Sequence, residues 1–301
     1  MSDITKLGID GEPIETYHAN PAVSHSKLRF FAGNFAATYK AKHIDHSIPE
    51  DESEAFTFGS YFHALALEGQ EATDKRFAVL PTGAPKRPTA KQLTAKKPSP
   101  DTLAAIAWWD DFGKQIEGKE LIDADDVATA KAMASGVWAN PTAVALLQAG
   151  RAEVTFRHSK VPGMALQTRP DWWNPAGCDL TDGRPYIVDV KTISNLKTEW
   201  QHQFFKFGYH LAAAFARSVI SDCDGWEGMP PDYLFLVVEK EGTNQCEVYR
   251  PDEATLDEAR RQNLCDLKRL LACYQTGNWP GGAKEIQNVS APDWWITKTK
   301  T

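Results

Sequence analysis

The sequence is 301 residues long, which fits two ordinary domains or one large α/β domain. Hydrophobic residues make up 42% of it and charged residues 24%, so a disordered, collagen-like or coiled-coil protein is excluded. No apolar run approaches the roughly 20 residues of a membrane span, and the first residues lack the apolar stretch of a secretory signal. We therefore expect a globular, cytoplasmic protein.

The five cysteines form no recognisable framework. Their number is odd, and no two of them stand in a C-x-x-C pair. This disfavours a disulfide network, a structural zinc site and an iron–sulfur cluster. We expect reduced thiols at Cys178, Cys223, Cys246, Cys265 and Cys273.

Charge is distributed unevenly along the chain. The net charge is −7, but the stretch from Lys75 to Pro100 holds seven basic residues and no acidic one, so the rest of the chain carries −14. The five prolines of this stretch disfavour a regular element. It is either a solvated linker or a basic loop that contacts a polyanion. The basic residues available for such contacts include Lys86, Arg87, Lys91, Lys96 and Lys97.

The first 140 residues are predicted to be mainly helical. After an irregular start over residues 1–20, a cap at Ser24 or Ser26 begins a helix that runs to about Lys40. Apolar spacing predicts further helices over Thr57–Leu67, Asp101–Ile116, Ala124–Trp138 and Pro141–Gln148.

Beyond residue 150 the pattern changes to strands. Tyr186–Ile193 is β-branched and mostly apolar, so we expect it to be central in a sheet. The other predicted strands are Ala152–His158, Met164–Trp173, Tyr233–Glu239 and Gln245–Tyr249. Two helices are predicted over Leu196–Ser218 and Asp252–Thr276. This order predicts an α/β (α+β) fold in which helices flank a mixed central sheet.

We expect one compact domain with three regions. Residues 1–140 form an added helical region that includes the basic segment 75–100. Residues 141–280 form the core, and residues 281–301 form a tail.

Two carboxylates and a lysine stand out in the predicted sheet. Asp189 and Lys191 are two residues apart on one strand, so their side chains lie on the same face. Alone, the pair is most simply a salt bridge. Asp171, at the end of the preceding strand, adds a second carboxylate, and two carboxylates on paired strands suit Mg²⁺ or Mn²⁺. Such a metal would orient a scissile phosphate, and Lys191 would position or help deprotonate the attacking water.

Two further residues admit two interpretations each. Glu153, on the first predicted strand, is another metal ligand or an exposed charge. His63, beside Phe62, is a site residue or a satisfied core histidine, and Gly59 one turn earlier would let a phosphate or a backbone approach it. His63 and Glu68 are five residues apart, so an α-helix would not place them on one line.

Together these stretches resemble the PD-(D/E)xK nuclease superfamily in its RecB-like branch. More narrowly, they are similar to the C-terminal nuclease domain of RecE (exonuclease VIII) of phages and prophages. The likeness rests on the G-x-x-x-H-x-x-x-x-E pattern from Gly59 to Glu68, on Asp171, and on the D-V-K triplet that ends at Lys191. The opening YHANPAVSHSKLRFF is also similar, and the resemblance extends from about Tyr17 to Tyr249.

The resemblance implies a restriction-endonuclease-like core and a Mg²⁺-dependent 5′→3′ exonuclease, in which Mn²⁺ can substitute. Its substrate would be the ends of double-stranded DNA, and it would leave 3′ single strands for a RecT-like annealing protein. It also implies a homo-oligomeric ring around the duplex. In the family's roles Asp171 and Asp189 bind the metal, Lys191 serves the attacking water, and His63 is a metal ligand or site residue.

The following helix departs from a family pattern. Many relatives carry Q-x-x-x-Y there, whereas Gln203 and Tyr209 are six residues apart and Ala212 stands where glutamine is common. Arg169, Gln203 and Tyr209 are further candidates for DNA contacts.

Two other functions fit the same residues. A structure-selective or restriction-like endonuclease would cut a supercoiled circle, which an exonuclease leaves intact. A catalytically inactive DNA-binding module is disfavoured, because it has no use for a costly cluster of carboxylates and lysine.

Overall fold

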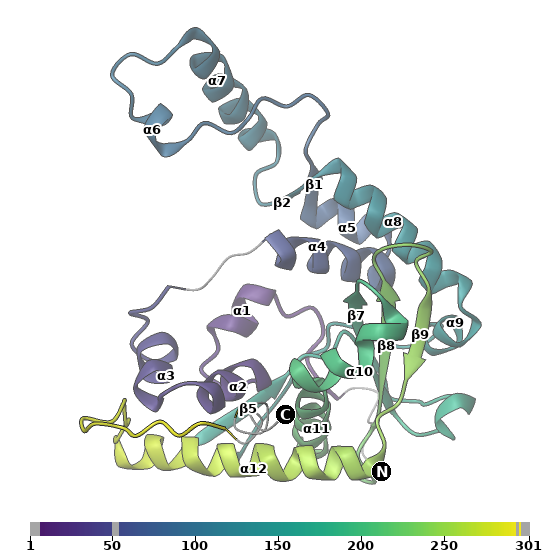
Figure 1. The fold of residues 1–301 in the computed structure, drawn as a ribbon. Coiled ribbons are helices and arrows are strands. Elements are labelled where there is room, and N and C mark those ends of the chain that lie inside the picture. Colours follow the sequence, from purple (N-terminus) through teal and green to yellow (C-terminus); the bar gives the residue numbers. More distant parts are fainter. Residues whose placement is uncertain (1–6, 50–53, 293–294, 296–301) are drawn as a thin grey trace.

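The computed structural model describes residues 7–49, 54–292 and 295, and its core is a five-stranded mixed sheet (Figure 1). The strand order is β3-β6-β7-β8-β9, in which only β7 and β8 run parallel. The strands are β3 (Arg151–Ala152), β6 (Trp172–Asn174), β7 (Tyr186–Ile193), β8 (Asp232–Glu239) and β9 (Cys246–Tyr249). The predicted mixed sheet is confirmed, with β7 in its centre.

Side chains along the two central strands alternate between two apolar cores. On β8 the odd-numbered residues 233–237 enter the first core, and the even-numbered residues 234–238 enter the second. On β7, Ile187 belongs to the first core and Val188 to the second. Asp189 and Lys191 share the parity of Ile187, so they lie on the face of the first core.

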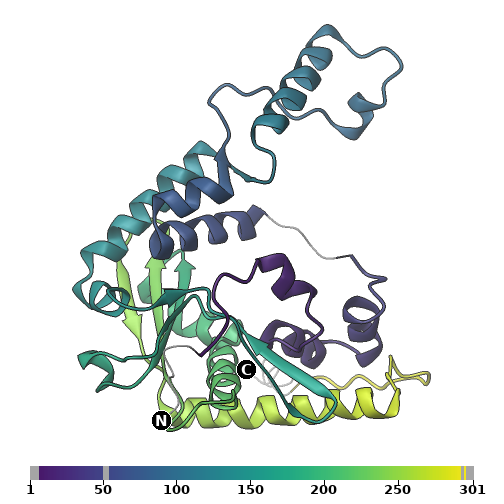
Figure 2. The same ribbon diagram turned by 180° about the vertical axis from the view of Figure 1, so that it is seen from behind.

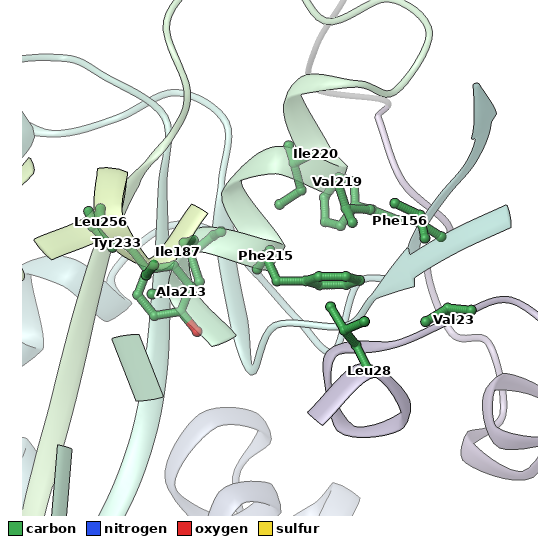
Figure 3. Close-up of a cluster of buried hydrophobic side chains, with 14 of the residues drawn as sticks. Val23, Leu28, Phe156, Ile187, Ala213, Phe215, Val219, Ile220, Tyr233 and Leu256 are labelled. Atoms are coloured by element: carbon green, nitrogen blue, oxygen red, sulfur yellow. The ribbon is translucent and has the colours of Figure 1, made fainter. Parts of the chain in front are cut away.

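Five helices contribute to the first core. They are α2 (His25–Gly33), α3 (Ala36–His43), α10 (Leu196–Lys206), α11 (Tyr209–Ser221) and α12 (Glu253–Thr276). Figure 3 shows Phe215 and Val219 of α11 lying near Phe156 and Leu28, which come from distant parts of the chain. Helices α10 and α11 connect the parallel strands β7 and β8, as a crossover between parallel strands requires.

The second core lies under the helices on the other face. These are α4 (Glu54–His63), α8 (Ala124–Ala139) and α9 (Pro141–Leu147). Asn140 accepts hydrogen bonds from the amides of Thr142 and Ala143, and Pro141 occupies the first turn, so α9 begins where the sequence predicts. A π-helix, Ala64–Glu68, continues directly from α4.

A separate hairpin and the N-terminal segment lie beside the sheet. The hairpin consists of β4 (Phe156–Val161) and β5 (Met164–Thr168). The amide of Ile9 donates to the Thr155 carbonyl at 2.8 Å, which fastens the N-terminal segment next to β4. Two short helices, α1 (Ile14–Ala19) and α3 (Ala36–His43), complete this part of the molecule.

An arm extends away from the body in both views (Figures 1 and 2). Its base contains α5 (Gln70–Arg76) and the parallel pair β1 (Phe77–Val79) and β2 (Glu120–Ile122). Beyond the base it carries α6 (Ala90–Leu93) and α7 (Pro100–Gln115), and α7 has no buried residue. The indole Nε1 of Trp109 donates to the Pro85 carbonyl at 2.9 Å, and this bond ties the proline-rich loop to α7.

Two predicted strands are interrupted. Met164–Trp173 divides at Arg169–Asp171 into β5 and β6, which belong to different sheets, because Pro170 cannot donate a ladder hydrogen bond. The predicted strand Ala152–His158 breaks after Ala152, since Glu153 adopts a positive φ of 55°.

Two predicted helices are also divided. The helix expected to run from Ser24 to Lys40 ends at Gly33 and resumes at Ala36. The helix expected over Leu196–Ser218 is two helices, because Gly208 takes the left-handed conformation with φ 69°. The basic segment is more regular than predicted, since it contains α6, which Thr89 and Gln92 cap reciprocally.

No helix within residues 7–49 and 54–292 is long and apolar enough to cross a membrane. The five cysteines are free thiols, as predicted.

Candidate metal-dependent active site

The pairing of β6 with β7 places two carboxylates side by side. Trp172 is opposite Val188 in an antiparallel register, so Asp171, one residue before β6, comes next to Asp189. The amide of Val190 donates to Asp171 Oδ2 at 2.7 Å. Burial alone would raise the pKa of Asp171, but His63, Lys191 and this amide lower it to about 2. Asp171 is therefore ionised at neutral pH.

Asp189 and Lys191 form an ion pair on the same face of β7. Burial raises the pKa of Asp189. The Lys191 ammonium group lowers this pKa, the Asp171 carboxylate raises it further, and the net change is a rise. Burial would lower the pKa of Lys191, but the two carboxylates raise it on balance. In the metal-free protein Lys191 is thus an ammonium ion, suited to offset phosphate charge and to orient a water molecule.

His63 approaches the carboxylates from the end of α4. Its Nδ1 lies 3.6 Å from Asp171 Oδ1, and the side chain is mostly buried. Burial would lower the pKa of His63, yet the Asp171 carboxylate raises it on balance. The histidine ring therefore faces the carboxylate cluster.

Glu153 joins the cluster through an unusual backbone. Its φ of 55° lies in the left-handed region, which non-glycine residues rarely adopt, and such outliers concentrate at functional sites. Its amide donates to the Asp171 carbonyl at 3.1 Å, and its Oε2 accepts from Arg169 Nε at 2.7 Å. Burial and Asp171 raise the pKa of Glu153, while Arg169 opposes this rise.

The donor atoms of three of these residues fit a divalent cation. One ligand atom each from His63, Glu153 and Asp171 lie within 4.8 Å of one another. Carboxylate oxygens and an imidazole nitrogen are ligands that divalent cations accept in proteins. Asp189 is not one of these three residues, although the sequence predicts it as a metal ligand; it pairs with Lys191. From the sequence Glu153 is the weakest candidate, whereas the geometry places it in the cluster.

A cavity of about 530 Å³ opens onto the cluster. His63, Glu153, Arg169 and Glu68 line it, together with Arg76, which pairs with Glu68 at 2.9 Å. His63 and Glu68 line the same cavity although an α-helix would not place them on one line, because the π-helix that begins after His63 shifts the phase of the following residues.

The N-terminal segment 11–15 also forms a wall of the cavity, which sequence reasoning missed. The Glu12 carbonyl accepts from Arg169 Nη1 at 2.7 Å, and the Glu12 carboxylate pairs with Arg157 at 3.2 Å. Arg169 therefore joins this wall to Glu153. No sequence signal links Glu12 to residues more than 140 positions away.

The remaining candidates for DNA contacts lie in different places. Tyr209 is at the site, with its ring centroid 5.3 Å from Lys191 Nζ. Gln203 donates to Glu199 at 2.8 Å on α10. The five basic residues of the arm are exposed, and they are Lys86, Arg87, Lys91, Lys96 and Lys97.

The fold is similar to that of a solved structure. The crystal structure of a "Putative exonuclease" from Eubacterium rectale matches with a TM-score of 0.58 at 13% identity, over 97% of this chain and 98% of that one. The crystal structure of SSO0001 reaches a TM-score of only 0.27 at 10% identity, over 69% of this chain and 86% of that one. No curated protein sequence matches the chain significantly. The family described as a PDDEXK-like domain of unknown function (DUF3799) matches residues 24–292, so the chain belongs to this family, as its motifs predict.

Proposed function

We propose that this protein is a metal-dependent exodeoxyribonuclease that hydrolyses phosphodiester bonds at the ends of linear double-stranded DNA. The observation that carries the proposal is the meeting of His63, Glu153 and Asp171 within 4.8 Å, beside the Asp189–Lys191 pair. Membership of the PDDEXK-like family supports a nuclease site built on a divalent metal.

Each residue has a distinct task in this proposal. Asp171, Glu153 and His63 hold Mg²⁺ or Mn²⁺. Asp189, across the β6–β7 pair from Asp171, adds a further carboxylate beside them. When bound, the metal polarises the scissile phosphate and acidifies its bound water. Lys191, kept cationic by Asp189, offsets the charge that develops on the phosphate and orients the attacking water.

The finer parts of the proposal rest on the resemblance to RecE-like nucleases. They are 5′→3′ polarity, 3′ single-stranded products, a homo-oligomeric ring around the duplex, and a RecT-like annealing partner in a phage- or prophage-infected bacterial cell. The word exonuclease in the name of the Eubacterium rectale protein favours digestion from ends.

The test is digestion of end-labelled linear duplex and of a supercoiled circle, each with Mg²⁺ or with EDTA. We expect metal-dependent loss of the linear duplex and an intact circle, and the order in which the two labels are released gives the polarity. Cutting of the circle would establish an endonuclease instead. Binding to DNA without any digestion would indicate a module that only binds.

Replacement of Asp189 tests the assigned residues. Asp189→Asn should lower activity at least ~10²-fold, because it removes a carboxylate from the site and the partner that holds Lys191. The fold should persist, since the substitution relieves repulsion from Asp171. Asp257→Asn, the same change on the exposed surface of α12, is the matched control and should leave activity unaltered. Near wild-type digestion by Asp189→Asn would refute the site.

A further inference from the structure

The turn between α10 and α11 presents phenylalanine rings to solvent. Phe205 is 52% exposed and Phe207 is 42% exposed. From Phe204 to His210 every residue except Gly208 is aromatic or basic. Exposed aromatic rings gathered on one turn are typical of a binding surface rather than of ordinary protein surface.

This aromatic turn (residues 204–210) is held in one conformation. Gly208 has φ 69°, and a Cβ at this position would collide with the guanidinium of Arg29. The same guanidinium donates from Nη2 to the Lys206 carbonyl at 2.9 Å. The rings therefore stand on a turn that is ordered before any partner arrives, so little conformational entropy is lost when a partner binds.

One ring of the aromatic turn lies beside Lys191 of the acidic cluster. The Tyr209 ring lies 5.3 Å from Lys191 Nζ, and the Phe207 ring centroid lies 5.8 Å from that of Tyr209. A continuous path of rings thus leads from the site to the exposed face. Cations accompany it, since Lys206 Nζ lies 5.4 Å from the Phe207 ring centroid and Arg29 lies under the turn.

We propose that Phe205 and Phe207 stack on unpaired bases of the DNA strand whose phosphate lies at the acidic cluster. Flat rings beside cations match a nucleic-acid strand, which offers base faces and phosphates together. This inference rests on the proposed nuclease function and specifies its substrate: a strand whose bases are unpaired next to the bond that is cut.

The experiment compares two single strands of equal length, one of thymidines and one abasic, so that they differ only in their bases. Affinities are measured in the Asp189→Asn background, which prevents digestion. The protein without further changes should prefer the thymidine strand by about fivefold or more, because stacking one base on an aromatic side chain contributes about 1 kcal/mol or more.

Three sets of variants test the two rings. Phe205→Leu with Phe207→Leu should abolish the preference and leave the affinity for the abasic strand unchanged. Phe205→Trp with Phe207→Trp should restore it, since the ring face and not apolarity is required. Phe35→Leu, at another exposed phenylalanine (61%), is the control and should have no effect.

The ways in which the test can fail are distinguishable. If the leucine variant still prefers the thymidine strand over the abasic strand, the inference is overturned. It is also overturned if the variant changes its oligomeric state but not its affinity for DNA, because the turn would then be a contact between copies of this chain. If the protein with Asp189 digests linear DNA in either case, the proposed function stands. If it digests none, the proposed function fails whatever the turn binds.

Discussion

The ion pair between His63 and Asp171 makes the stability of the metal-free protein depend on pH. Because Asp171 raises the pKa of His63 against the opposing effect of burial, the pair contributes fully below the ordinary histidine pKa of about 6.5. Its contribution is lost as pH rises through the raised pKa of the folded state. We expect the melting temperature in EDTA to fall as the pH rises above about 6.5. In His63→Gln this part of the fall should be absent.

The same variant separates a site residue from a packing residue. If His63 binds the metal, His63→Gln should lower turnover by about 10²-fold or more, with little loss of folded protein. A histidine that only fills space would lower the melting temperature at every pH and leave turnover per folded molecule intact.

Among the site residues, the sequence predicts those whose positions follow from the alternation of side chains along a strand. Asp189 and Lys191 share a face because side chains alternate, and Asp171 joins them because β6 and β7 are neighbours in an antiparallel pair. Glu153 reaches the metal-ligand group because its backbone has a left-handed φ. Glu68 reaches the cavity because it ends a π-helix. Neither conformation has a signal in a single sequence.

The break between α10 and α11 is the element on which the aromatic turn depends. Gly208→Ala should destabilise the protein by more than the ~1–2 kcal/mol of a left-handed alanine, because the new methyl group also displaces Arg29. Gly277→Ala is the matched control, since Gly277 has φ 67° and open space around its Cα. The free energies of unfolding of both variants in urea give the comparison, and equal losses would show that the Arg29 contact contributes nothing.

Glycine and proline explain which elements the sequence predicted well. Pro141–Leu147 and Glu253–Thr276 match their predicted spans closely, because caps and uniform periodicity define them. Gly208 lies inside a helical pattern, where a glycine is normally tolerated. The pattern alone therefore did not show that this residue adopts a left-handed conformation and separates two helices. Pro170 carried a readable signal, since a central strand excludes proline.

Over the whole molecule, the long basic stretch without acidic residues, Lys75–Pro100, lies on the arm, while the rest of the chain is acidic. Neutralising Lys86, Arg87, Lys91, Lys96 and Lys97 together should weaken DNA affinity and flatten its dependence on salt, by up to about 0.9 in log–log slope for each phosphate that these side chains neutralise. The rate at saturating DNA should change far less, because these exposed side chains contribute nothing to the metal cluster.

A control distinguishes the position of the basic residues on the arm from their effect on the net charge of the protein. Neutralising basic residues on α12 gives a nearly equal change in net charge at a distant surface and should leave affinity almost unchanged; these are Arg260, Arg261, Lys268 and Arg269. Equal salt slopes for the wild-type protein and the arm variant would show that DNA enters elsewhere and that the segment is only a linker.

A chain trimmed to the family region would lose the N-terminal wall of the cavity. Residues 11–15 shape the space in front of the metal ligands, yet they precede the region 24–292 by which the family is recognised. A polypeptide trimmed to that region would keep His63, Glu153 and Asp171 but would leave Arg169 without its bond to Glu12. A change in this segment, which lies outside the matched region, would therefore alter the space in front of the metal ligands without altering the ligands themselves.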